Sequence, residues 1–132
     1  MTTIFKDRAR KSLTKKANKG YSGHPIATIA FYGPTDAVAT KVAVSIILEK
    51  DAPPDVLKRW FSEKDVRSDP AVLEQVLKFI SEKSARSVVM PDRIIGCPHE
   101  EGIDYPNDET CPACTFWKNR DRWTGKLLAK ER

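Results

Sequence analysis

Three cysteines and one histidine lie within eighteen residues in the C-terminal third of this 132-residue chain. Cys97 and His99 form a C-x-H pair, and Cys111 and Cys114 form a C-x-x-C pair after a loop of eleven residues. Thiolate sulfur and imidazole nitrogen are ligands that zinc prefers, and structural sites usually supply them as two close pairs. A proline inside each pair favours the turn that chelation needs. The spacing therefore predicts one tetrahedral zinc site.

Four protein ligands indicate a structural metal, because a catalytic zinc keeps one coordination position open for water. Three alternatives remain open at this point. One is a labile catalytic zinc. Another is an iron–sulfur cluster, although the usual cysteine spacing of such clusters is missing. The third is a set of small buried side chains beside a surface histidine, without any metal.

The two ligand pairs and the segment that follows them are similar to the treble-clef and zinc-ribbon group of structural zinc modules. The likeness covers residues 96–120 and rests on the type and pairing of the ligands. The short C-x-H pair departs from the commoner C-x-x-C pair. The resemblance implies a knuckle or treble-clef-like zinc module and no particular activity.

The net charge of +5 is unevenly distributed along the chain. Residues 1–20 carry seven basic side chains against one acidic one, and residues 115–132 carry six against two. The loop from Cys97 to Cys114 instead holds five acidic residues and no lysine or arginine. Basic ends favour binding to a polyanion such as nucleic acid. The acidic loop disfavours contact between the metal site itself and such a partner.

Aromatic and basic residues alternate after the last cysteine. Cations of this kind contact phosphates and the rings stack on bases, so the candidate nucleic-acid-binding residues are Trp117, Lys118, Arg120, Arg122 and Trp123. The same pattern also fits a helix whose rings seal the zinc module. A protein-interaction module that docks a partner through the acidic loop or the tryptophans is a further alternative.

A metal-dependent hydrolase is the enzymatic alternative. Asp36, Asp92 and Glu100 could hold a hard divalent ion if the fold brought them together. Turn-forming aspartates and a solvated loop charge explain the same residues without catalysis. His24, which precedes a proline, is interpreted as a surface or capping residue. We therefore expect a noncatalytic protein without an organic cofactor.

The elements that must position the site begin with a basic segment. Residues 1–22 contain few large apolar groups and predict a mobile arm, with a short helix over about 4–18 as the alternative. β-Branched and aromatic residues favour a strand over 25–31. A turn at 33–36 and an alternating strand over 41–48 complete an antiparallel hairpin.

Two helices and a third strand are expected next. The apolar residues of 56–61 fall at helical spacing, and a longer amphipathic helix over 69–84 begins with an Asp cap followed by proline. A short apolar strand over 87–90 then leads toward Cys97. The helices would cover one face of a small sheet, which is an α+β arrangement.

The size of the chain predicts one domain over residues 23–124, including the zinc module at 96–120, followed by a basic tail at 125–132. No apolar run approaches the ~20 residues that span a bilayer. An odd number of cysteines fits reduced thiols in the cytoplasm better than a disulfide framework. We expect a cytoplasmic protein that contacts no membrane.

Overall fold

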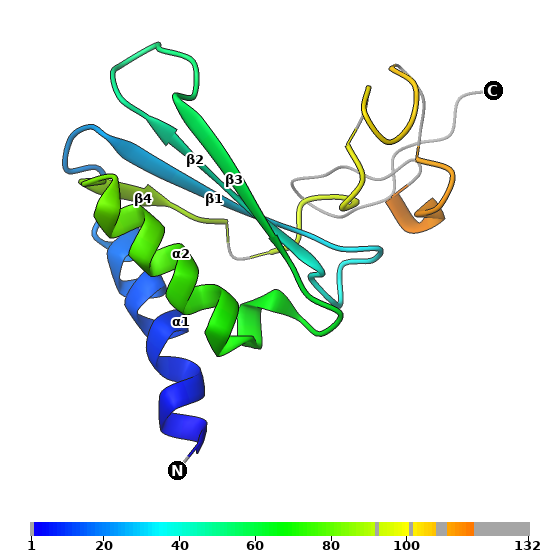
Figure 1. The fold of residues 1–132 in the computed structure, drawn as a ribbon, viewed down its shortest axis with the longest axis horizontal. Coiled ribbons are helices and arrows are strands. Elements are labelled where there is room, and N and C mark those ends of the chain that lie inside the picture. The colour runs from blue at the N-terminus through cyan, green and yellow to red at the C-terminus, as the bar shows by residue number, and fades with distance from the viewer. Residues whose placement is uncertain (1, 92, 101, 108–110, 118–132) are drawn as a thin grey trace.

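The computed structural model describes residues 2–91, 93–100, 102–107 and 111–117. It contains two α-helices, four strands and two short 3-10 turns (Figure 1). In chain order these are α1 (Thr2–Asn18), β1 (Ile26–Tyr32), β2 (Lys41–Ile47), β3 (Val56–Phe61), η1 (Val66–Ser68), α2 (Pro70–Glu82), β4 (Ser87–Val89) and η2 (Thr115–Trp117).

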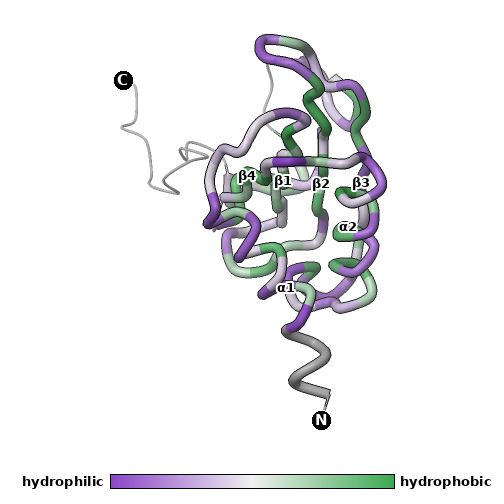
Figure 2. The backbone as a smooth tube through the Cα atoms, turned by 90° about the vertical axis from the view of Figure 1, so that its left-hand side faces the viewer, coloured by the Kyte–Doolittle hydropathy of each residue, from purple (hydrophilic) through white to green (hydrophobic). Residues whose placement is uncertain are grey.

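The four strands form one mixed sheet in the order β3-β2-β1-β4. β2 pairs antiparallel with both β1 and β3, and β4 pairs parallel with β1. Both helices lie on the same face of this sheet (Figures 1 and 2). Large side chains that are almost fully buried, such as Ile29, Val44 and Leu73, come from the facing surfaces of the strands and α2. Each such side chain contributes about 1.5–3 kcal/mol of hydrophobic stabilisation.

The predicted α+β class is confirmed, and so are the hairpin, the long amphipathic helix and the last short strand. Alternation predicted β1 and β2 well because one side of each strand packs in the core. At the start of α2, the Asp69 carboxylate accepts hydrogen bonds from the amides of Ala71 at 3.1 Å and Val72 at 3.4 Å. Pro70 follows the cap at the first helical position, as expected.

The predicted helix over residues 56–61 is wrong, because this segment is the edge strand β3. Six residues are too few for a stable helix on their own, whereas a strand here completes the hydrogen bonds of β2, with Trp60 opposite Val42. The Trp60 ring packs edge-on against Phe79, with the ring centres 5.8 Å apart. Its indole N–H donates to the Gln75 side chain at 3.0 Å.

The N-terminal segment also differs from the predicted basic arm of residues 1–22, because Thr2–Asn18 is an α-helix. Ala9 and Leu13 on this helix are only 2% and 1% exposed. They lie one turn apart on the side of α1 that packs against α2 and β4. Two well-placed apolar residues therefore bring α1 into the core. The other predicted domain boundaries stay predictions.

Candidate metal centre

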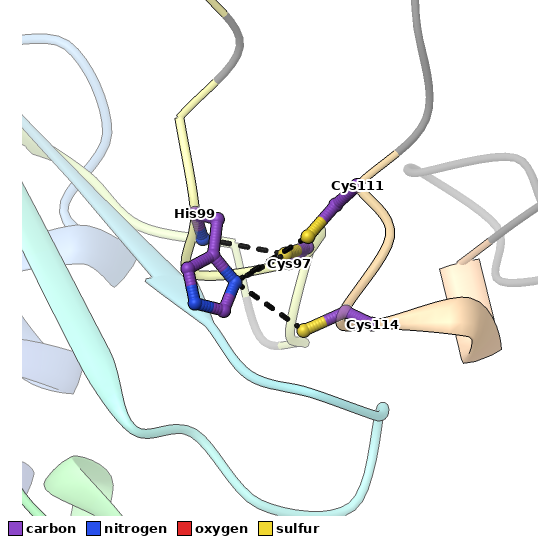
Figure 3. A group of neighbouring side chains, drawn as sticks. All are labelled: Cys97, His99, Cys111 and Cys114. Carbon is purple, nitrogen blue, oxygen red and sulfur yellow. Dashed lines mark hydrogen bonds between the residues drawn. The ribbon is translucent and has the colours of Figure 1, made fainter. Parts of the chain in front are cut away.

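Cys97, His99, Cys111 and Cys114 come together at one end of the sheet, and their ligand atoms all lie within 4.8 Å of one another (Figure 3). The Nδ1 atom of His99 is 3.2 Å from the Cys97 sulfur and 3.5 Å from each of the other two sulfurs. Tetrahedral zinc would separate sulfur and nitrogen ligands by roughly 3.6 Å, given metal–ligand distances of about 2.3 and 2.0–2.1 Å. The four side chains are therefore close enough to coordinate one metal ion, with Nδ1 as the histidine ligand.

The first ligand pair follows a segment that extends the sheet beyond β4. Ile94 forms a parallel bridge with Phe31, and the Ile95 amide donates to the Phe31 carbonyl at 3.0 Å. Cys97 therefore stands where this segment leaves the end of β1. Beyond it the chain turns sharply, and the amide of His99 donates to the Cys97 sulfur at 3.3 Å. This turn directs the imidazole back toward the sulfur atoms.

The second ligand pair is held by the aromatic residues that follow it. Cys111 and Cys114 are buried. In η2 the Trp117 amide lies 3.3 Å from the Cys114 carbonyl oxygen, to which it donates. The Trp117 indole N–H donates to the backbone carbonyl of Gly33 at 2.8 Å. Phe116 packs edge-on against the same indole, with ring centres 5.1 Å apart.

Gly33 joins both halves of the candidate site to the sheet. Its carbonyl accepts the hydrogen bond from Trp117, and its own amide donates to the Gly96 carbonyl at 2.8 Å. Gly96 directly precedes Cys97, and Trp117 follows Cys114 by three residues. One residue at the end of β1 thus positions both ligand pairs relative to each other.

The sulfur atoms have unequal electrostatic surroundings. Burial raises the pKa of the Cys97 thiol and that of the Cys114 thiol. Burial acts in the same direction on Cys111, but amide N–H groups of Ala113 and Cys114, together with the neighbouring thiols, outweigh it and lower the Cys111 pKa. A group of three such sulfurs needs a cation to hold several thiolates together. The donor chemistry therefore fits a bound metal.

A buried lysine fixes the loop that carries His99. Lys41, the first residue of β2, is only 3% exposed. Its ammonium donates to the Pro98 carbonyl at 3.0 Å and to the Glu100 carboxylate at 2.8 Å. It also lies 5.2 Å from the centre of the Tyr32 ring. These contacts hold the residues on both sides of His99 against the end of the sheet.

Glu100 is the common partner of two cations. The Arg59 guanidinium binds both carboxylate oxygens, at 2.5 and 2.8 Å, while Lys41 binds one of them. The Arg59 hydrogen bonds first, and then those from Lys41, lower the pKa of Glu100 to about 2. Glu100 is therefore an ionised loop anchor and differs from the solvated charge that we expected. Its low pKa does not suit a general acid at neutral pH.

The other predicted site residues lie in different surroundings. Trp117 is 9% exposed and packs in the core. Five others lie outside the described residues: Asp92, Lys118, Arg120, Arg122 and Trp123. Asp36 lies in an exposed bend, and among the described residues it belongs to no metal-binding cluster with Glu100. His24 contacts the Tyr21 hydroxyl at 3.2 Å, a local role in agreement with its interpretation as a surface residue.

Comparison of the chain with protein-family models, curated proteins and solved structures gives no match. Neither helix in the described part of the chain is long and apolar enough to cross a membrane.

The ion pairs of Glu100 give the first testable prediction. Glu100→Gln should lower the free energy of unfolding by about 2 kcal/mol, because it leaves the buried Lys41 ammonium without its anionic partner. Equilibrium denaturation at pH 7 measures the change. Glu63→Gln is the control: it removes the same charge from an exposed residue in the loop that follows β3. It should change the free energy of unfolding by less than about 0.5 kcal/mol. Equal effects of the two substitutions would contradict the anchoring role of Glu100.

Proposed function

We propose that Cys97, His99, Cys111 and Cys114 bind one zinc ion. The convergence of three sulfurs and one imidazole nitrogen within 4.8 Å of one another carries this proposal. Hard ions such as Mg²⁺ and Ca²⁺ prefer oxygen ligands, so the donor set favours a softer metal. Four-coordinate sites with three cysteines and one histidine are typical of structural zinc.

The zinc has a structural role in this proposal, because four protein donors fill its coordination shell. Each ligand pair is also attached to the sheet, one through Gly96 and the Lys41 contacts and the other through Trp117. The metal would therefore link two loop segments that have little regular secondary structure of their own. It would hold these two segments together at one end of the domain. No reaction is assigned to it.

Nucleic-acid binding is the function that the basic N-terminal region supports best. Arg8, Lys11 and Lys15 are exposed on α1 at positions i, i+3 and i+7, opposite the buried Ala9 and Leu13. We call these three residues the basic stripe; at 1.5 Å rise per residue they extend over roughly 10 Å of the helix. The salt bridges of the described residues involve Lys41, Arg59 and Arg67 and leave the stripe out. A linear polyanion with closely spaced phosphates complements such a stripe.

The basic stripe gives a direct test of nucleic-acid binding. Replacing Arg8, Lys11 and Lys15 together by alanine should raise the dissociation constant for a short oligonucleotide about tenfold or more at low salt. The variant should also flatten the dependence of log K on log salt by about 2–3, because fewer counterions are released. Fluorescence anisotropy at several salt concentrations measures both quantities.

A matched control removes three exposed lysines elsewhere, Lys50, Lys64 and Lys78, and so has the same net charge as the stripe variant. We expect its affinity to fall much less. Absence of oligonucleotide binding by the unmodified protein at 50 mM salt would remove nucleic acid from the proposed function and leave the zinc site unaffected.

A further inference from the structure

A cleft opens beside α1, and residues of α1, β1, α2 and the segment after β4 line it. Its volume is about 150 Å³. Leu13 of α1, Phe31 of β1, Leu73 of α2 and Met90 after β4 supply its apolar lining. An apolar cavity of about this volume can hold one benzene-sized ring. The cleft therefore has the size and the lining for a single six-membered ring.

The rim of the cleft on α1 is polar. Arg10, Thr14 and Asn18 line it at positions i, i+4 and i+8, which places them in one row along the helix. All three side chains are exposed. Together they offer guanidinium, hydroxyl and amide groups, which can both donate and accept hydrogen bonds. A ring with apolar faces and polar edges matches this combination, and a nucleobase is such a ring.

The same row of residues connects the cleft to the basic stripe. Arg10, Thr14 and Asn18 also border an open groove on the outer side of α1, where Lys11 and Lys15 form the opposite side. A ring seated in the cleft would thus be within one helix width of two cations of the stripe. Charge complementarity favours an occupant whose ring is flanked by phosphates. A helix of duplex DNA keeps its bases stacked and paired, so the ring must come from a single strand.

We propose that this cleft receives one unstacked base of a single-stranded nucleic acid, while Lys11 and Lys15 contact the phosphates beside it. This inference rests on the nucleic-acid binding proposed above. It adds that the ligand is single-stranded, and that the cleft contacts a base while the lysines contact the sugar-phosphate backbone.

The test compares a twelve-nucleotide oligothymidine with an abasic strand of the same length and phosphate charge. The full chain should bind oligothymidine about tenfold more tightly than the abasic strand, since a base that stacks or inserts in a protein site contributes on this scale. Ala17 is half-buried in the cleft lining, so Ala17→Leu places a larger aliphatic side chain in the cleft and should reduce oligothymidine binding to the level of the abasic strand. Its affinity for the abasic strand should not change.

Ser12→Leu is the matched control, because it adds the same side chain to α1 at another half-buried residue that lies outside the cleft lining. It should retain the preference for oligothymidine. Asn18→Ala, at an exposed position, tests the polar rim of the cleft without added bulk and should reduce the preference by about half or more. Circular dichroism and thermal unfolding verify that each variant is folded.

The outcomes separate the two proposals. If the unmodified protein binds both strands equally, the cleft does not recognise a base, and the nucleic-acid function stands. An equal loss of oligothymidine binding in Ser12→Leu would likewise overturn the cleft assignment. If neither strand binds at 50 mM salt, both proposals fail.

Discussion

Cys114→Ser should be purified with far less than one zinc per chain and should lose about 3–5 kcal/mol of its free energy of unfolding. The substitution removes a thiolate that completes the four-ligand set, and a serine hydroxyl does not replace it at neutral pH. Cys114 is buried, so the substitution alters the packed interior of the site. Elemental analysis measures the zinc, and denaturant titration measures the stability.

A strong zinc chelator provides the control for this prediction. Chelation of the unmodified protein should reproduce the loss of stability, and the same treatment should add little to Cys114→Ser, because both changes remove the same metal. Additive losses would show that the cysteine stabilises the fold independently of zinc. A Cys114→Ser protein with full zinc content would contradict the ligand assignment.

Gly33→Ala should destabilise the protein by about 3 kcal/mol or more and weaken its affinity for zinc. A β-carbon at this position would lie 1.8 Å from the Val38 carbonyl oxygen, which is part of the backbone and cannot turn aside. The turn must therefore shift, and with it the hydrogen bonds from Gly33 to Gly96 and from Trp117 to Gly33. Competition with a chelating dye measures the zinc affinity.

Gly20→Ala is the matched control for this substitution. Gly20 has a positive φ of 75°, but no heavy atom lies within 4 Å of the position that a β-carbon would take. Its replacement should therefore cost about 1 kcal/mol through backbone strain alone and leave zinc affinity unchanged. A Gly33→Ala variant that is as stable as Gly20→Ala would show that Gly33 is not needed to hold the two ligand pairs together.

Local patterns explain which parts of the fold could be predicted. The ligand pairs are recognisable because each pair is contained within four residues. Likewise, α2 has a complete apolar stripe and a local Asp69 cap. The sequence predicts a helix in place of β3, because the apolar residues Val56, Leu57, Trp60 and Phe61 also fit helical spacing. Nothing in the sequence shows that β2 pairs with another strand on that side.

The contacts that support the site could not be predicted, because their partners are distant in sequence. Lys41 and Glu100 are 59 residues apart, and Gly33 and Trp117 are 84 residues apart. Alternation along β2 correctly placed Lys41 on the side away from the core, but the loop that buries it comes much later in the chain. Whether Trp117 is a contact residue or a core residue depends in the same way on a distant carbonyl.

Zinc-edge X-ray absorption of the purified chain, combined with elemental analysis, tests whether Cys97, His99, Cys111 and Cys114 bind zinc. We expect about one zinc per chain, with three sulfur ligands at roughly 2.3 Å and one nitrogen ligand at roughly 2.0–2.1 Å. A folded chain that contains no zinc, and takes up none when zinc is added, would contradict this expectation.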